Sequence, residues 1–281
     1  MPTYLEILRL NEKYATDNDK EPTAIKRLMM HHAGLSATVF YQQQDQEMPK
    51  EAYQCFLKDV DAYIKKNTPV QHLIGHEYFY GYCFHVNPDV LIPRYETEEL
   101  VTNVLDYMDS FFDDSPLKVV DIGTGSGCIA ISLKKERPTL TVHASDISEK
   151  ALKVAQKNAE SLEAEVVFKP GDMTSPWVGE TFDVIVSNPP YLKNGEEVQS
   201  IVLHNEPHVA LFGGDDGLKY YRRLFEEAPA ILNKRYFIAL EHGFDSAKAI
   251  LKMAKKLLPG TEIFQKKDMQ GKDRMTFIVK K

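Results

Sequence analysis

The sequence predicts an α/β protein with a doubly wound, mostly parallel sheet that follows a small helical domain. From Leu117 onward, short apolar runs rich in β-branched residues alternate with helical patterns, as they do in parallel sheets. From Tyr4 to about Asn67, apolar residues recur at helical spacing with little strand signal. At 281 residues the chain is long enough for two hydrophobic cores. The expected domains are a helical bundle over 1–68, a β-hairpin linker over 69–93 and the sheet domain over 94–281.

Composition and charge narrow the class of function. A formal net charge of −7 and a pI near 5.8 argue against a dedicated nucleic-acid binder, which usually carries a basic surface. Cys55, Cys83 and Cys128 are too few for a disulfide framework and odd in number, so we expect a reducing, cytoplasmic location. We see no secretory signal at the amino terminus and no apolar run long enough for a membrane span.

The helical region is defined by apolar stripes and by breaks between them. The stripes comprise Ile25, Leu28, Met29 and His32, and then Tyr53, Phe56, Leu57, Val60, Tyr63 and Ile64. Breaks are expected near Asp17–Asp19, at Gly34–Ser36 and at Pro49, and Ser36 is a plausible cap for the next helix. We expect the methionine and aromatic side chains here to form a core and not a cofactor site.

The linker changes to a strand-like pattern. Tyr78–Tyr80 and Tyr82–Val86 flank Gly81, which predicts a hairpin, and Val90–Ile92 reads as a connecting strand. A helical pattern from Glu96 to Met108 then leads to the sheet domain.

Four side chains near this hairpin are candidate zinc ligands. Cys83 and His85 would share one face of their strand, and His72 and His76 lie nearby in the sequence. No Cys-x-x-Cys or second spaced pair completes a zinc site. We therefore expect packing and surface roles for these residues and no metal.

In the sheet domain, strands and helices alternate. The expected strands are Lys118–Ile122, Thr139–Ala144, Glu165–Phe168, Phe182–Val186 and Tyr236–Glu241. The expected helices are Cys128–Lys135, a helix capped by Ser148 that runs to about Ala159, Leu218–Ala230 and Ser246–Leu258.

A glycine-rich turn follows the first of these strands. Gly123, Gly125 and Gly127 let the backbone turn sharply and approach a ligand, and the helix amino terminus behind them favours negative charge. The spacing is Gly-x-Gly-x-Gly, which is neither the dinucleotide pattern nor a P-loop. Asp146 ends the second strand, nineteen residues past Gly127, where a ribose-binding acid is expected. Together they predict a nucleoside-containing cofactor.

Asn188-Pro189-Pro190-Tyr191 follows the fourth strand. Two prolines cannot continue a sheet ladder, so a stiff loop leaves the sheet at the carboxyl end of the strand, where ligands bind in open α/β sheets. The Asn188 side-chain oxygen and the Pro189 carbonyl would present two acceptors to a planar amino group. Without the glycine-rich turn upstream, a simple Pro-Pro turn after a strand would be the preferred explanation of these residues.

These motifs in this order resemble a class I S-adenosylmethionine-dependent methyltransferase of Rossmann-like fold. More narrowly, the chain resembles the bacterial release factor glutamine methyltransferases, also called the HemK or PrmC family. The motifs that carry the narrower resemblance are Pro69–Gly75, Phe79–Gly81, Val90–Glu98, Glu206–Pro207 and Ala210–Leu218. Tyr95 departs from the family pattern, which usually has a second proline there.

The resemblance implies roles for individual residues. Gly123, Thr124, Gly125, Ser126 and Gly127 would wrap the methionine end and the ribose of S-adenosylmethionine, whose product is S-adenosylhomocysteine. Asp146 would accept from the ribose hydroxyls or merely cap a helix, and Asp172 and Met173 would lie beside the adenine. Thr97 and Arg94 belong to a motif that closes over the cofactor, although Arg94 could equally form a structural ion pair. Glu262–Phe264 and Met275–Val279 would form the antiparallel terminal strand pair.

The resemblance also implies a substrate. The family methylates the side-chain amide nitrogen (N5) of the glutamine in the Gly-Gly-Gln motif of class 1 peptide chain release factors. By this match Asn188 and the Pro189 carbonyl would aim the amide, and Pro190 and Tyr191 complete the catalytic motif. Tyr191 would pack on the planar carboxamide or simply form a pocket wall. The helical region would dock the release factor, and we expect no direct contact with nucleic acid or membrane.

Two other functions remain open. Adenine and guanine also carry a planar amino group, so a DNA or RNA amino-methyltransferase is the alternative enzyme. A scaffold protein that merely resembles a methyltransferase would be expected to lose Asn188 or a glycine of the turn, and both are present.

Overall fold

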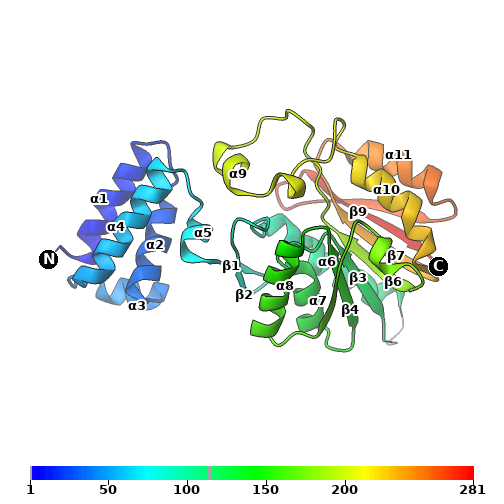
Figure 1. Cartoon of the computed structure of the whole chain (residues 1–281), viewed down its shortest axis with the longest axis horizontal. Helices are drawn as coiled ribbons and strands as arrows, with labels where there is room; N and C mark the ends of the chain where they lie inside the picture. The colour runs from blue at the N-terminus through cyan, green and yellow to red at the C-terminus, as the bar shows by residue number, and fades with distance from the viewer. Residues whose placement is uncertain (1, 113–115) are drawn as a thin grey trace. The chain divides into compact units, whose positions relative to one another are not determined.

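The computed structural model describes residues 2–112 and 116–281, and it divides into two compact units (Figure 1). One unit consists of Met1–His76 and Val198–Asn205, and the other of Glu77–Glu197 and Glu206–Lys281. The sequence analysis placed residues 198–205 in the methyltransferase domain, whereas their contacts place them with the amino-terminal helices. We call these two parts the helical unit and the catalytic unit.

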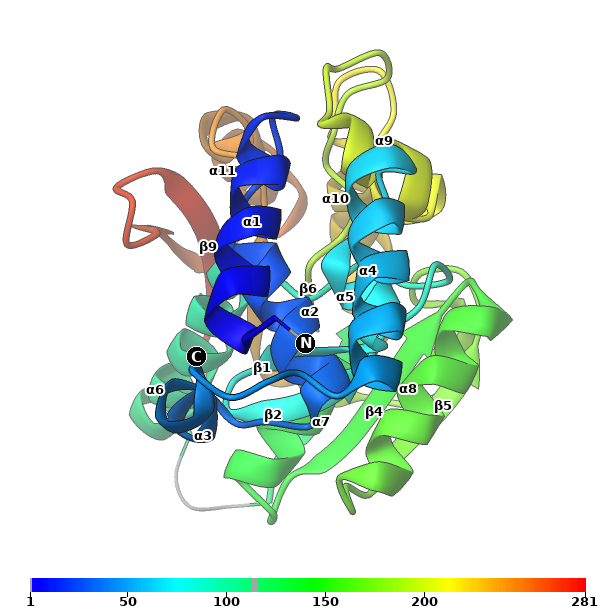
Figure 2. The ribbon, with the colours of Figure 1, turned by 90° about the vertical axis from the view of Figure 1, so that its left-hand side faces the viewer.

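The helical unit is a bundle of short helices around one apolar core. Its helices are α1 (Tyr4–Thr16), α2 (Thr23–Ala33), α3 (Ala37–Gln43), α4 (Lys50–Lys65), α5 (Val70–Ile74) and α9 (Ser200–Asn205). Helix α2 contacts both α1 and α4 (Figure 2), and it buries Ile25, Leu28 and Met29 completely. Ser36 accepts a hydrogen bond from the Val39 N–H, which confirms the predicted cap.

Helix α9 is held in the helical unit by specific contacts. The Asn205 side chain donates to the Asn67 carbonyl over 2.8 Å, and the Asn67 side chain donates to Ser200 Oγ over 3.0 Å. Ile201 packs against the apolar core of the same unit. A six-residue helix is too short to be stable alone, so these contacts explain why it forms.

The catalytic unit is built on a seven-stranded sheet in the order β5-β4-β3-β6-β7-β9-β8. Its strands are β3 (Lys118–Ile122), β4 (Thr141–Asp146), β5 (Val166–Pro170), β6 (Phe182–Ser187), β7 (Leu232–Glu241), β8 (Glu262–Lys267) and β9 (Asp273–Lys280). All pairings are parallel except those of β9 with β7 and β8. The predicted sheet and its antiparallel terminal pair are both confirmed.

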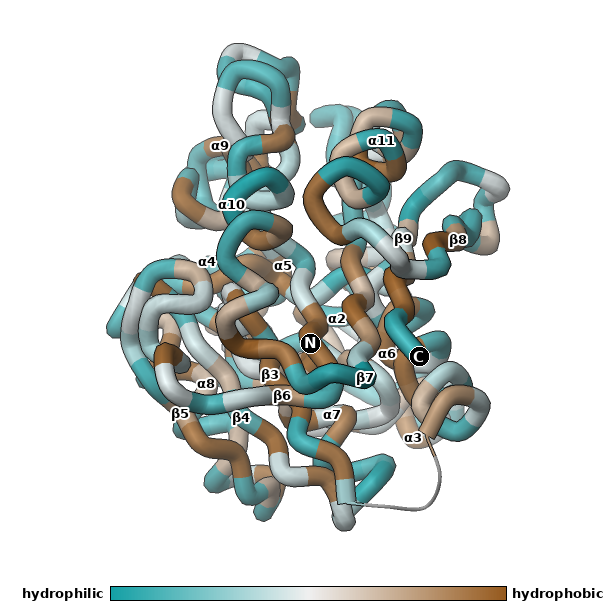
Figure 3. The backbone as a smooth tube through the Cα atoms, turned by 90° about the vertical axis from the view of Figure 1, so that its right-hand side faces the viewer, coloured by the Kyte–Doolittle hydropathy of each residue, from teal (hydrophilic) through white to brown (hydrophobic). Residues whose placement is uncertain are grey.

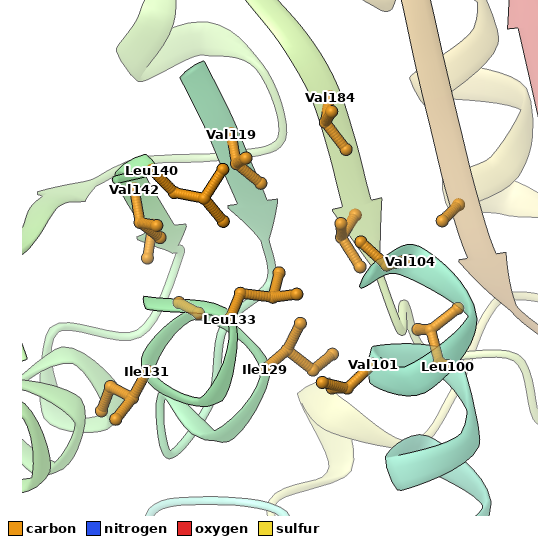
Figure 4. Packing of buried hydrophobic residues seen from close by; sticks show 14 of the residues in the cluster. Leu100, Val101, Val104, Val119, Ile129, Ile131, Leu133, Leu140, Val142 and Val184 are labelled. Carbon is orange, nitrogen blue, oxygen red and sulfur yellow. The ribbon is translucent and has the colours of Figure 1, made fainter. Parts of the chain in front are cut away.

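Helices cover both faces of this sheet because successive side chains of a strand point to opposite faces. The helices are α6 (Tyr95–Phe111), α7 (Cys128–Glu136), α8 (Glu149–Ser161), α10 (Lys219–Glu227) and α11 (Ala247–Leu257). Val119 and Val184 pack with side chains of α6 and α7 (Figure 4), whereas Val120 and Ile185 pack with α10 and α11. Hydrophobic and hydrophilic residues alternate along α10 and α11, as amphipathic covering helices require (Figure 3).

The segment before α6 corrects one prediction. The hairpin forms as β1 (His76–Phe79) and β2 (Tyr82–His85), but Val90–Ile92 is not a strand. The Asn87 side chain bonds the Asp89 N–H and makes a turn there, and the Ile92 N–H donates to the Glu206 carboxylate and to no neighbouring strand. Val90 and Ile92 are apolar because they are buried, at 1% and 2% exposure.

Candidate active site

A pocket opens at the carboxyl ends of β3, β4 and β6 and encloses about 950 Å³, counting its open mouth. This is the edge of an open α/β sheet at which ligands bind. The predicted site residues that line it are Arg94, Thr97, Gly123, Thr124, Gly125, Ser126, Asp146, Asp172, Met173, Asn188, Pro189 and Pro190. Gly127 and Tyr191 are the predicted site residues that are not part of the lining.

The glycine-rich turn forms the floor of this pocket. Gly123 and Gly125 have φ angles of +76° and +55°, and nothing lies within 4 Å of where their Cβ atoms would be. They are therefore needed for the shape of the turn and leave open space beside it. At Gly127, by contrast, a Cβ would lie 2.9 Å from Ile131 Cδ1 and 3.1 Å from Ala155 Cβ. Gly127 thus allows α7 and α8 to approach each other and is not part of the pocket lining.

Asp146, at the end of β4, holds the glycine-rich turn in place. One carboxylate oxygen accepts from the Gly125 N–H over 2.9 Å, and the other from the Ser148 N–H over 2.8 Å. Burial raises the pKa of Asp146, and these backbone N–H groups lower it. Each oxygen keeps a second lone pair, so the same carboxylate can still accept from a ligand hydroxyl.

Asp172 lies beside Met173 at the end of β5 and is engaged by an arginine that the sequence did not indicate. Arg223 on α10 donates to both Asp172 oxygens, over 2.9 and 2.8 Å, and also pairs with Glu227. Both bonds come from Nη1, so one guanidinium nitrogen bridges the two carboxylate oxygens and fixes the direction of the carboxylate. Met173 is buried and lines the pocket as an apolar surface.

Arg94 forms an ion pair with Glu206, whose side chain is only 1% exposed. The second Glu206 oxygen accepts from the Ile92 N–H over 3.0 Å. Of the two roles left open for Arg94, the structural pair is therefore present, and Arg94 also lines the pocket. Glu206 belongs to one of the sequence motifs, but no local pattern predicts its ion pair with Arg94, which lies 112 residues earlier in the chain.

Asn188 is held by two side chains from distant parts of the chain. Its Nδ2 donates to Thr97 Oγ1 over 3.1 Å, and the Thr97 hydroxyl donates to Glu241 Oε2 over 2.7 Å. Glu241 ends β7 and is 2% exposed. Burial raises its pKa to about 7, against the lowering effect of the Thr97 hydrogen bond and the Arg274 charge. Glu241 was not among the expected site residues, although a carboxylate closing a buried apolar strand is the signal that could have found it.

Tyr191 lies behind the pocket. Its ring packs against the apolar cluster between the sheet and α10–α11, and burial raises the pKa of its hydroxyl to about 12. Two glycines back the loop here: a Cβ on Gly213 would lie 2.5 Å from the Pro190 carbonyl oxygen, and one on Gly217 would lie 2.4 Å from that of Tyr191. Tyr191 therefore anchors the Asn-Pro-Pro-Tyr loop by packing against the apolar core.

This close backing gives a testable prediction. Gly213→Ala should displace the Asn-Pro-Pro-Tyr loop, because its Cβ would meet backbone oxygens of Pro190 and Gly217. We expect a loss of about 1–3 kcal/mol in unfolding free energy, as for other overpacked sites, together with slower methyl transfer. Thermal unfolding and a methyl-transfer assay measure the two effects. Gly243→Ala is the matched control, because a Cβ there has its nearest neighbours at 3.4 Å; equal behaviour of both variants would contradict the close-packing argument.

Cys128 also lines the pocket but is not a nucleophile. It is buried, and desolvation raises its pKa to about 12, so the thiol stays protonated. Within residues 2–112 and 116–281 no group of three or more histidine, cysteine or carboxylate side chains is arranged to hold a metal ion. No helix in that same part of the chain is long and apolar enough to cross a membrane.

Solved structures with the same fold confirm the class. A methyltransferase from Pyrococcus furiosus superposes with a TM-score of 0.53 at 21% identity, covering 79% of this chain and 98% of the other. A 16S rRNA N2 G1207 methyltransferase from Thermus thermophilus superposes with a TM-score of 0.53 at 16% identity, covering 73% and 50%. At such identities the likeness shows the fold alone.

Sequence relatives are more specific. Residues 6–75 match the family model "PrmC N-terminal domain", and residues 103–209 match "Methyltransferase small domain". The chain is 39% identical to the release factor glutamine methyltransferase of Bacillus subtilis, covering 98% of this chain and 96% of the relative. It is 43% identical to that of Neisseria gonorrhoeae, covering 74% and 75%. The chain therefore belongs to the release factor glutamine methyltransferase family.

Proposed function

We propose that the protein methylates the side-chain amide nitrogen of the glutamine in the Gly-Gly-Gln motif of class 1 release factors, with S-adenosylmethionine as the donor. The observation that carries this proposal is the position of Asn188. Its Nδ2 donates to Thr97 Oγ1, so its oxygen is left for the pocket, next to Pro189. Two acceptors at the end of β6 suit a group that has two N–H bonds and no charge.

The pocket fits the proposed donor. Gly123 and Gly125 leave open space for a close backbone approach, Asp146 keeps acceptor capacity for a ribose diol, and Met173 offers an apolar surface for a ring. When bound, S-adenosylmethionine supplies an electrophilic methyl group on a sulfonium. No residue here needs to act as a nucleophile, in agreement with the protonated state of Cys128.

The contribution of the chain to the chemistry is alignment and electrostatics. An amide nitrogen is a poor nucleophile because its lone pair is delocalised into the carbonyl. Hydrogen bonds to Asn188 Oδ1 and the Pro189 carbonyl would aim the nitrogen and stabilise the positive charge that develops on it. The charged product readily loses a proton, so no strong general base is required.

The proposal is tested by mass spectrometry of acceptors incubated with the protein and S-adenosylmethionine. A release factor should gain 14 mass units on the Gly-Gly-Gln glutamine, as a methyl group replaces a hydrogen, and a variant factor with that glutamine changed to alanine should gain none. DNA and RNA offered in parallel should remain unmodified, because the chain is acidic overall. Methylation of nucleic acid with none on the release factor would instead establish the amino-methyltransferase alternative.

We further propose that the helical unit docks the release factor, because Gly-Gly-Gln alone offers little contact area. Leu10 and Tyr41 are exposed apolar side chains of this unit, at 66% and 58%. The double variant Leu10→Ala with Tyr41→Ala should raise KM for the whole factor by about tenfold, the equivalent of 1.4 kcal/mol, and leave KM for a Gly-Gly-Gln peptide unchanged.

Steady-state kinetics with both substrates measure this effect. Val178→Ala serves as the control, because Val178 is an apolar residue of the catalytic unit that is even more exposed, at 78%. An equal rise in KM for factor and peptide, or none for either, would remove the docking role from these two side chains.

A further inference from the structure

The orientation of the Asn188 amide decides whether the site can work. A carboxamide has an acceptor end and a donor end that differ only in the placement of oxygen and nitrogen. With the oxygen toward the pocket, Asn188 accepts from an incoming amino group. Rotated by half a turn, it would present its own N–H groups to another donor and repel it. Neighbouring groups must therefore fix the Asn188 amide in one of these two orientations.

We propose that Glu241 and Thr97 are positioning residues that lock the Asn188 amide with its oxygen toward the methyl acceptor. This inference deepens the proposed function, on which it rests, and assigns a role to a buried carboxylate that is not part of the pocket lining. It also gives Thr97 a different task from the cofactor contact expected from the sequence.

The hydrogen-bond chain carries the argument. Thr97 has one hydroxyl proton, and the 2.7 Å contact gives it to Glu241 Oε2. Thr97 Oγ1 can then only accept along the 3.1 Å contact with Asn188, so the atom of Asn188 on that side must be the nitrogen. While it is ionised, Glu241 accepts hydrogen bonds and donates none, and because its pKa is raised to about 7, this orientation of Asn188 is fixed as the pH rises above that value. The Asn188 nitrogen is therefore bonded on the Thr97 side, which leaves the oxygen on the other side of the amide.

The end of this chain is itself fixed. Glu241 and Thr97 are 2% and 3% exposed, so water does not compete for their hydrogen bonds. The hydroxyl of Tyr221, which is fully buried on α10, donates to the Glu241 carbonyl over 2.8 Å and holds the end of β7. Three separate segments, α6, β6 and β7, thus converge on one amide.

The comparison of Thr97→Val with Thr97→Ser tests the proposal. Valine keeps the shape but neither donates nor accepts, whereas serine keeps the hydroxyl. For Thr97→Val we expect kcat to fall by up to about a hundredfold, as for a misplaced catalytic group, with the Kd for S-adenosylmethionine and the KM for the peptide unchanged. Thr97→Ser should recover most of the rate. Thr276→Val controls for loss of a buried threonine hydroxyl, since Thr276 is fully buried and bonds His242 and Gln265.

Three results would overturn the proposal: an unchanged kcat in Thr97→Val, a loss explained wholly by weaker cofactor binding, or a serine variant as slow as the valine variant. Single-turnover assays and isothermal titration separate these results. If the wild-type protein methylates nucleic acid and no release factor, the proposed function fails. The same comparison with that acceptor still decides the positioning role, because its amino group needs the same Asn188 oxygen.

Discussion

Asn188→Ala should transfer methyl groups roughly a hundredfold to a thousandfold more slowly than the wild type, like other enzymes that lose one preorganised transition-state hydrogen bond. The substitution removes the acceptor at the end of β6 but leaves the glycine-rich turn and Asp146 intact. The Kd for S-adenosylmethionine should therefore stay close to that of the wild type. Single-turnover transfer to a Gly-Gly-Gln peptide and titration with the cofactor measure the two quantities.

Asn194→Ala is a suitable control for this variant. Asn194 lies six residues further along, bonds Asp215 at the surface and is not part of the pocket lining. It should keep the wild-type rate. A collapse of cofactor affinity in Asn188→Ala, with transfer by the loaded enzyme intact, would show that Asn188 binds the cofactor and does not aim the amide.

Asp146→Ala should weaken binding of S-adenosylmethionine by about 1.5–3 kcal/mol for each charge-assisted hydrogen bond lost to the ribose. The loss should be larger than the ribose contacts alone imply, because Asp146 also holds the Gly125 N–H and so shapes the turn. Isothermal titration measures the affinity. Circular dichroism checks that the variant is folded.

Ser148→Ala separates the capping of α8 from the binding of the cofactor by Asp146. Ser148 caps α8 through its side chain, which accepts from the Ala151 N–H, while its own N–H to Asp146 remains in the variant. We expect about 1 kcal/mol lower stability and unchanged cofactor affinity. A folded Asp146→Ala variant that binds the cofactor as the wild type does would limit Asp146 to local capping.

Local patterns were sufficient for most of the fold. Each parallel strand carries its own apolar run, and the turn at Gly123–Gly127 and the prolines at 189 and 190 determine backbone shape within a few residues. The parallel part of the sheet, its flanking helices, the glycine-rich turn, Asp146 and the Asn-Pro-Pro-Tyr loop followed from these features. The antiparallel pairing of the last strands and the site roles of Arg94, Thr97, Asp172 and Met173 came from the family resemblance. The exceptions are informative: Val90–Ile92 has the composition of a strand but bonds to Glu206, and Tyr191 belongs to the loop motif but anchors it from the protein interior.

Pairings between distant residues could not be predicted. Thr97 and Glu241 are 144 residues apart, Arg94 and Glu206 are 112 apart, and Asp172 and Arg223 are 51 apart. Glu241 differs locally because it closes a buried apolar strand, but no local pattern in any of the three pairs identifies the partner residue. Their significance arises only when the sheet brings the strand ends and the preceding loop together.

The membership of α9 in the helical unit has a consequence for the order in which the protein is made. Synthesis delivers residues 1–76 first, yet the contacts of Ile201, Ser200 and Asn205 that complete this unit become available only after more than a hundred further residues. Closing such a long loop adds little free-energy cost, but it delays the completion of the helical unit. Until α9 has been synthesised, one side of the nascent amino-terminal bundle should therefore stay uncovered. A chain stalled between residues 77 and 197 should be cut by protease within this bundle more easily than the finished protein.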